Sequence, residues 1–255
     1  MQKKIILGVA VLLGVVAIAY GISTINSTKP SVGQEIPVVA TSTPNYTIEL
    51  LDDFDIREIM PNLDRGLTFT ESVPEVARVP MQKNYDAAVA RLKTDPMRAD
   101  DWFNLGIYYH AANDFKGAEE VWLFLIKVIP NSAVPLDNLG KMYKFDLKDF
   151  PKSEGYFKKS IALNPDSTTP YFELFELYRY LYKTNTTAAV DIVTQAAGKF
   201  PQNPDPHMVL GSYYRDIKNY AGARAEFTKA LDIARELKNV QLIDAIGDEI
   251  ANLPQ

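Results

Sequence analysis

Residues 101–130 read DWFNLGIYYHAANDFKGAEEVWLFLIKVIP, and the intervals between their apolar residues decide the fold. Trp102, Leu105 and Tyr109 recur at a spacing of three to four residues, which is typical of one apolar face of a helix. Gly106 lies among them and would let a second helix approach closely. A second apolar run comes next, and Pro130 marks its end, because proline cannot continue a helix. The stretch therefore predicts two antiparallel helices.

The same pattern occurs four times along the chain. Leu105 corresponds to Leu139, Leu174 and Leu210, at successive steps of 34, 35 and 36 residues. Three of the four copies carry a glycine directly after this leucine, and all four carry a tyrosine four residues after it. A half-copy at residues 85–96 precedes the four full copies. Self-similarity at this period indicates an array of identical supersecondary units.

The period and the positions of these residues resemble the tetratricopeptide repeat. The resemblance covers about residues 100–237 and implies an all-α fold, a right-handed α-solenoid of antiparallel helix pairs. One pair cannot bury its own apolar face, so several pairs have to stack. Residues 240–253 predict an amphipathic helix that caps the stack, and we expect the solenoid domain to span residues 81–255.

The third copy departs from the pattern. Phe175 stands where the other copies have glycine, and the loop at residues 183–187 is longer than its counterparts. A ring at a position of close approach should push the two helices apart. We therefore expect a wider or displaced third pair.

The N-terminus predicts a membrane segment. Residues 5–22 contain no charged side chain and are long enough to cross a hydrocarbon core as a helix. Lys3 and Lys4 lie before this run, and no Lys or Arg follows it until Lys29, so the positive-inside rule places the N-terminus in the cytoplasm and the solenoid outside it. We expect a transmembrane anchor at residues 5–25 of a single-pass membrane protein. The alternative is a cleaved signal peptide and a soluble exported protein, since residues 17–19 read Ala-Ile-Ala.

Two further segments separate this anchor from the solenoid. Residues 26–45 are rich in Ser, Thr and Pro, which is typical of a flexible linker. Residues 46–80 contain short apolar runs interrupted by acidic residues and proline, and predict irregular chain with short helices.

Composition excludes several classes of function. The chain has 255 residues and a net charge of −5, whereas nucleic-acid binding requires a basic surface. It has no cysteine and only two histidines, and it carries no phosphate-binding, nucleophile or metal-protease motif. We therefore expect no catalytic residue, no cofactor, no metal and no small-molecule substrate.

The resemblance implies that the first helix of each pair lines a concave groove. The residues expected to face it are Phe103, Ile107 and His110 in the first copy, Lys141 and Lys144 in the second, Phe172, Glu176, Arg179 and Tyr180 in the third, and Met208 and Arg215 in the fourth. Phe103 and Ile107 stand where some family members place side chains that clamp a terminal carboxylate, so that clamp is not expected. Aromatic anchors with a few cations suit a protein or peptide partner. We expect a scaffold or assembly helper, with a self-assembling structural protein of the cell envelope as the alternative.

Overall fold

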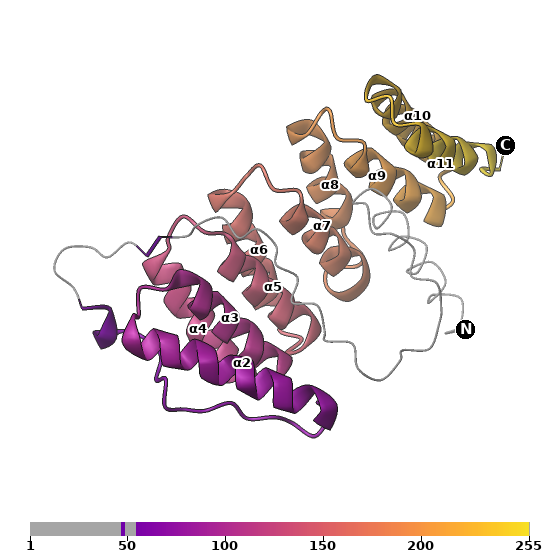
Figure 1. The fold of residues 1–255 in the computed structure, drawn as a ribbon. Helices are drawn as coiled ribbons and strands as arrows, with labels where there is room; N and C mark the ends of the chain where they lie inside the picture. The colour runs from indigo at the N-terminus through magenta and orange to yellow at the C-terminus, as the bar shows by residue number, and fades with distance from the viewer. Residues whose placement is uncertain (1–46, 49–54, 255) are drawn as a thin grey trace.

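The computed structural model of the chain describes residues 47–48 and 55–254 (Figure 1). Every regular element within these residues is helical, which confirms the predicted all-α class there. The elements are η1 (Ile56–Glu58), α2 (Glu75–Thr94), α3 (Ala99–Ala111), α4 (Phe115–Val128), α5 (Val134–Phe145), α6 (Phe150–Leu163), α7 (Thr169–Glu176), η2 (Leu177–Leu181), α8 (Ala188–Lys199), α9 (Asp205–Asp216), α10 (Tyr220–Glu236) and α11 (Val240–Ala251).

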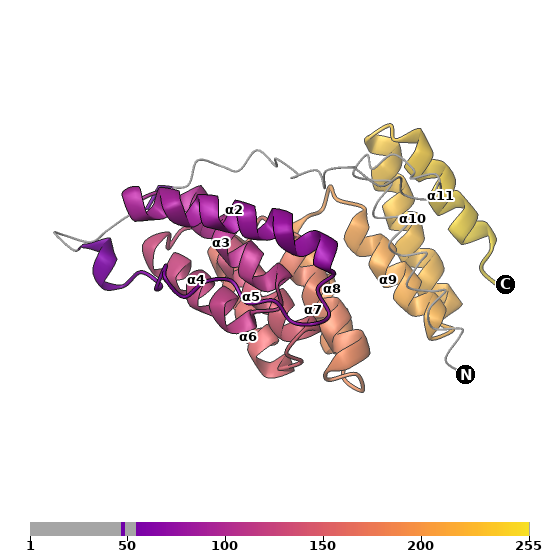
Figure 2. The same ribbon diagram turned by 60° about the horizontal axis from the view of Figure 1, so that its bottom comes forward.

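The helices form a stack of pairs in chain order. Helices α3 and α4, α5 and α6, α7 and α8, and α9 and α10 lie against each other as four antiparallel pairs, with α2 before them and α11 after them (Figures 1 and 2). The first helices of these pairs are α3, α5, α7 with its continuation η2, and α9. The second helices are α4, α6, α8 and α10.

None of the helices in the described residues is long and apolar enough to cross a membrane. The predicted anchor at residues 5–25 and the linker at residues 26–45 lie outside the described residues.

Glycines permit the close contact within three of the pairs. A Cβ atom added to Gly106 would overlap the Trp122 ring, and a Cβ on Gly140 or Gly211 would lie 2.6 Å from a phenylalanine ring. Because no side chain fits in that space, the aromatic residue of the second helix packs directly on the backbone of the first. The predicted role of Gly106 is thereby confirmed.

The third pair solves the same packing problem with the residue sizes exchanged. Phe175 occupies the glycine position on α7, and Val193 on α8 stands where the other second helices have Trp122, Phe157 or Phe227. Both Phe175 and Val193 are buried in one apolar cluster. Room for the ring of Phe175 therefore comes from the smaller residue on the opposite helix.

The first helix of the third pair also changes from α-helix to π-helix near its C-terminal end. Helix α7 ends at Glu176, and the chain continues as a single stretch of π-helix, η2. A π-helix adds a residue to the turn, and such insertions occur frequently at functional sites. The distortion lies at the end of the helix that leads into the long loop at residues 183–187.

Irregular chain before α2 covers the N-terminal end of the stack. Ile56 and Leu63 are buried in the same apolar cluster as the first pair. Arg65 Nη2 lies 2.7 Å from Asp114 Oδ1, and its guanidinium carbon lies 5.0 Å from the centre of the Tyr109 ring. Helix α2 then begins at Glu75, before the predicted domain boundary at residue 81.

Candidate functional site

The four copies carry a basic side chain at one shared position, five residues after the repeat leucine. These residues are His110, Lys144, Arg179 and Arg215. Each lies near the C-terminal end of a first helix, where a cation interacts favourably with the helix dipole. All four were predicted to face a groove, and in the structure each contacts an acidic residue from the next unit of the stack.

The first two contacts link the first three pairs. His110 Nε2 lies 2.9 Å from Asp146 Oδ2, directly after α5. Lys144 Nζ lies 2.7 Å from a carboxylate oxygen of Glu173 and 2.7 Å from one of Glu176, both on α7. The Lys144 side chain is almost completely buried. A buried ammonium requires such compensation, because an unpaired charge in the interior is very unfavourable.

The other two contacts continue the series to the end of the chain. Arg179 Nη2 lies 3.8 Å from Asp216 Oδ2, and the Arg179 guanidinium carbon lies 4.5 Å from the centre of the Tyr213 ring. Arg215 pairs with Glu249 on α11. We name the contacts of these four basic residues with acids the ion-pair ladder. It joins each first helix to the next.

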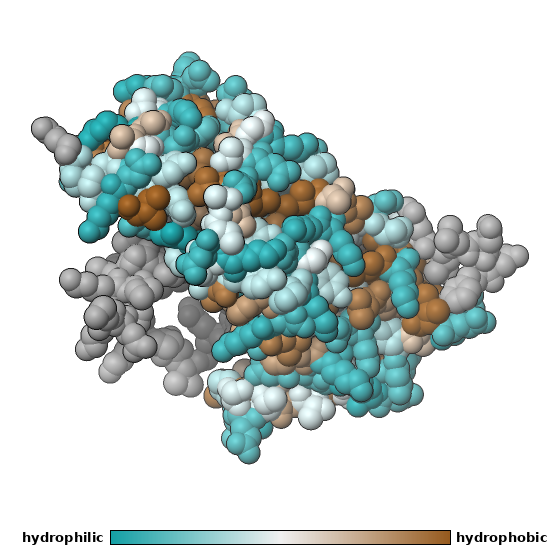
Figure 3. Space-filling model, turned by 180° about the vertical axis from the view of Figure 1, so that it is seen from behind, coloured by the Kyte–Doolittle hydropathy of each residue, from teal (hydrophilic) through white to brown (hydrophobic). Residues whose placement is uncertain are grey.

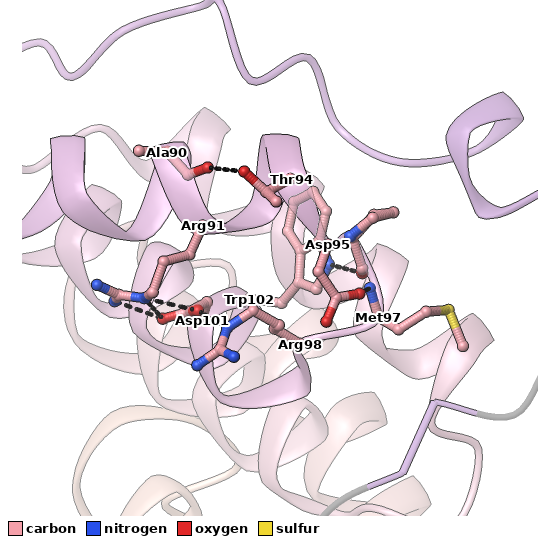
Figure 4. A network of polar contacts seen from close by, with 9 residues as sticks. Ala90, Arg91, Thr94, Asp95, Met97, Arg98, Asp101 and Trp102 are labelled. Carbon is pink, nitrogen blue, oxygen red and sulfur yellow. Dashed lines mark hydrogen bonds and ion pairs between the residues drawn. The ribbon is translucent and has the colours of Figure 1, made fainter.

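A similar arrangement precedes the ladder, between α2 and α3 (Figure 4). Asp101 is buried, and its carboxylate receives Arg91 Nη2 at 2.6 Å and Arg98 Nε at 2.6 Å. Burial alone would raise the pKa of Asp101, but the hydrogen bonds from the two arginines outweigh it and lower that pKa. Trp102 Nε1 donates to the carbonyl of Pro96 at 2.8 Å, which fixes the start of α3.

A second series of contacts joins the pairs through tyrosine hydroxyls. Tyr178 donates to Glu154 at 2.8 Å, Tyr143 donates to Glu119, and the hydroxyls of Tyr85 and Tyr109 lie 2.9 Å apart. In each case the two residues are 24 positions apart in the sequence. We name these contacts the tyrosine ladder.

The tyrosine ladder stops at the fourth pair. The residue 24 positions before Tyr214 is Val190, which has no polar side-chain atom to accept a hydrogen bond. The third and fourth pairs therefore meet without the contact that joins the earlier ones.

Glu154 is the most strongly bonded acid of this series. Besides Tyr178, its carboxylate receives Lys158 Nζ at 2.6 Å and Lys183 Nζ at 2.7 Å. Burial would raise the pKa of Glu154, but these hydrogen bonds outweigh it and lower the pKa to about 2. Glu154 thus stays ionised while joining α6, η2 and the turn after η2.

The predicted apolar residues differ in how much of each is open to a partner. Phe103 is 6% exposed and belongs to the apolar core, while Phe172 and Met208 are partly buried. Ile107 is 50% exposed and Tyr180 is 48% exposed. Ile107 and Tyr180 are thus the predicted large apolar residues whose side chains are exposed to solvent on the first helices.

The predicted charged residues are held by their neighbours. Glu176 belongs to the ion-pair ladder together with Lys144, and Lys141 Nζ lies 3.7 Å from a carboxylate oxygen of Glu173. The acidic partners Asp146, Asp216 and Glu249 were missed, although each lies 34 to 37 residues after its basic partner. The missed signal was an opposite charge one repeat further along the chain.

On the face seen in Figure 3, apolar residues gather in separate patches among hydrophilic ones. An open depression also lies between α10 and α11, lined by Leu231, Arg235, Ile243, Asp244, Gly247 and Asp248. Among the described residues, no group of three His, Cys, Asp or Glu side chains has a geometry that could hold a metal ion.

A comparison of the sequence with models of known protein families also finds the repeat. The family model described as tetratricopeptide repeat matches residues 177–236, which span η2 to α10. No curated protein sequence matches the chain.

Solved structures that resemble the chain include three named proteins. MamA is 22% identical over 59% of this chain and 81% of its own, with a TM-score of 0.41. Yeast Tom70 is 17% identical over 64% of this chain and 42% of its own, with a TM-score of 0.39. PilW, described as a widely conserved type IV pilus biogenesis factor, is 20% identical over 70% of this chain and 94% of its own, with a TM-score of 0.42. The family match at residues 177–236 confirms the predicted resemblance to the tetratricopeptide repeat.

Proposed function

We propose that this chain is a membrane-anchored repeat protein that binds another protein through the exposed face of its first helices, as a scaffold or assembly helper. Its role is binding and not catalysis. The domain organisation that goes with this proposal is a cytoplasmic N-terminus at residues 1–4, an anchor at 5–25, a linker at 26–45 and an extracytoplasmic solenoid.

The observation that carries the proposal is the ion-pair ladder beside exposed apolar side chains. The ladder fixes neighbouring first helices at their C-terminal ends, so their outer faces are held in place before any partner arrives. A preorganised surface loses less entropy on binding than a flexible one. Ile107 and Tyr180 stand exposed on this surface, and large exposed side chains of this kind act as anchors in protein interfaces.

The buried residues of the predicted set contribute to this function indirectly. Lys144 and Phe103 are buried, so they hold the shape of the face and leave the contact to their exposed neighbours. This divides the predicted groove residues into a supporting set and a contacting set.

Photo-cross-linking in cells tests the binding face. A photoreactive residue replaces Ile107 or Tyr180 in the full chain, and a matched control replaces Leu123, which is exposed on the second helix α4. We expect one protein to dominate the adducts at both test positions and to be absent at position 123. Equal adducts at all three positions, or none at the test positions, would overturn the proposal.

The proposed topology can be tested separately, because the chain contains no cysteine. A single cysteine is introduced as Gln2→Cys or as Lys116→Cys, at an exposed site on α4. With a maleimide that does not cross membranes, we expect K116C to react in intact cells and Q2C only after lysis. Loss of residue 2 from the mature chain would identify a cleaved signal peptide instead, and labelling of Q2C in intact cells would reverse the topology.

A further inference from the structure

The turns from a first helix to its second helix share one local form. An apolar residue is followed by a residue with positive φ and then by a polar residue: Ala112-Asn113-Asp114, Leu147-Lys148-Asp149, Tyr182-Lys183-Thr184 and Ile217-Lys218-Asn219. In antiparallel pairs these turns all lie at the same side of the stack. We name this side the turn edge.

The first turn of this edge is covered by the chain's own irregular segment. Thr70 N donates to the carbonyl of Ala112 at 3.3 Å, and Asn113 Nδ2 donates to Thr70 Oγ1 at 3.1 Å and to Ser72 Oγ at 2.9 Å. Arg65 pairs with Asp114, the third residue of the turn. As a result Ala112 is completely buried. The structure thus shows how non-helical chain binds at the turn edge.

The second and fourth turns have the same form without such a cover. Leu147 is 42% exposed and Ile217 is 46% exposed, so no described segment lies over them as residues 65–72 lie over Ala112. Phe145 and Leu181 are large exposed apolar residues at the neighbouring helix ends. The turn edge therefore continues beyond its covered part as a row of exposed apolar side chains.

The charges along the uncovered part favour an acidic ligand. Lys148 and Lys218 are exposed, and neither has an ion pair within the described residues. The acids beside them have other partners: Asp146 is hydrogen-bonded to His110, Asp149 pairs with Lys152 at 3.6 Å, and Asp216 lies 3.8 Å from Arg179. The ammonium groups of Lys148 and Lys218 therefore remain available to an acidic ligand.

We propose that the turn edge of the second to fourth pairs binds an extended, acidic segment of a partner protein. Apolar side chains of the segment lie on Leu147 and Ile217, and its carboxylates lie at Lys148 and Lys218. Anionic lipid headgroups would also bind these two lysines. A peptide is favoured because the covered turn is held by peptide groups and hydroxyl side chains. The inference rests on the proposed function only in taking the ligand to be a protein.

Selection from a random peptide library tests the preference. Peptides of twelve residues are selected on the full chain held in detergent micelles, and the enriched ones are labelled and titrated by fluorescence anisotropy. We expect the enriched set to combine Asp or Glu with Leu, Ile or Phe, and its binding to weaken with salt, because exposed charge pairs are screened. No enrichment, or enrichment without acidic residues, would overturn the proposal.

Three matched double variants locate the site. L147S/K148N and I217S/K218N each remove the apolar side chain and the cation, and asparagine tolerates the positive φ of the lysine position. L237S/K238N makes the same change in the turn between α10 and α11, where Leu237 is 54% exposed and Lys238 also has positive φ. That turn lies at the opposite side of the stack.

We expect each of the first two variants to weaken peptide binding at least about tenfold, a change of about 1.4 kcal/mol, and the third to leave it unchanged. Equal loss in all three variants would overturn the location. Binding of the chain to anionic phosphatidylglycerol vesicles, lost in the first two variants while peptide binding is kept, would identify a membrane-facing edge instead.

The two proposals fail in different ways. If the adducts at positions 107 and 180 persist in L147S/K148N and no acidic peptide is selected, the turn-edge proposal fails and the first-helix face stands. If acidic peptides bind at the turn edge and positions 107 and 180 yield no adduct, the first-helix face fails.

Discussion

At the scale of single residues, Glu154 shows how one carboxylate joins two helix pairs. Its pKa is lowered to about 2 from an ordinary value near 4.5, so the ionised form stabilises the fold above pH 4.5 and that contribution is lost as the pH falls towards 2. We expect Glu154→Gln to lower the free energy of unfolding by roughly 2–3 kcal/mol at pH 7. Urea unfolding at pH 7 and at pH 3 measures the difference.

The acid dependence distinguishes this electrostatic role from simple packing. The deficit of E154Q should shrink between pH 4.5 and pH 2, because the wild-type carboxylate becomes protonated over that range. Glu236→Gln, at the exposed end of α10, is the control and should change stability by less than about 0.5 kcal/mol. A deficit of E154Q that stays constant with pH would contradict the assignment.

Gly140 is a second residue whose environment decides the outcome of a substitution. Its added Cβ would lie 2.6 Å from the Phe157 ring, so we expect Gly140→Ala to destabilise the chain by about 1–2 kcal/mol in spite of the better helix propensity of alanine. Gly155 in α6 has nothing within 4 Å of an added Cβ, and Gly155→Ala should stabilise by about 0.5–1 kcal/mol. Thermal unfolding of both variants checks the opposite signs.

At the scale of elements, the third pair carries its aromatic ring on the first helix instead of the second. We expect Val193→Phe to cost about 1–3 kcal/mol, because Phe175 already fills the space between α7 and α8. Phe175→Gly alone leaves a cavity and should cost about 3–5 kcal/mol. The double variant F175G/V193F restores the arrangement of the other pairs and should be more stable than either single change.

A double-mutant cycle in urea measures this exchange. The control pair combines V193F with Gly140→Ala in a different helix pair, where the two costs should simply add. Additive costs in F175G/V193F as well would mean that Phe175 and Val193 do not share one space.

The sequence could predict the helices and their contact faces, but not the π-helix or the exchange of residue sizes in the third pair. The spacing of Leu105, Gly106 and Tyr109 identifies a helix and its contact face, because both result from local sterics and a regular period. The π-helix of η2 and the size exchange at Val193 could not be foreseen in the same way. They depend on how two helices accommodate each other after the chain has folded.

At the scale of the whole molecule, the ladders explain why the predicted groove residues have different roles. Their order along the first helices could be taken from the repeat, and Ile107 and Tyr180 are exposed as an anchor requires. The burial of Lys144 and the acids that hold it were not predictable, because they come from a different helix pair. A repeat register identifies positions, whereas contacts between repeats decide which side chains remain available.

The same contacts predict where the stack opens first. In a stack of repeats, stability is approximately the sum of the units and of the interfaces between neighbours. The interface before the fourth pair lacks a tyrosine contact, since Val190 stands where Glu119 and Glu154 stand in earlier pairs. The third pair, on the other side of this interface, contains the π-helix η2. We therefore expect local opening to need the least free energy at α9, α10 and α11.

Hydrogen exchange tests this order of opening. We expect amide protons of α9 to exchange faster than those of α5, although the two helices occupy equivalent places in their pairs. Val190→Glu places an acid 24 residues before Tyr214, as in the earlier pairs, and should slow exchange in α9 to α11. In a background of Tyr214→Phe the same substitution has no hydroxyl to bind and should give no protection. Equal exchange in α5 and α9, or a V190E effect that survives without the Tyr214 hydroxyl, would show that the tyrosine ladder does not set the stability of the interfaces.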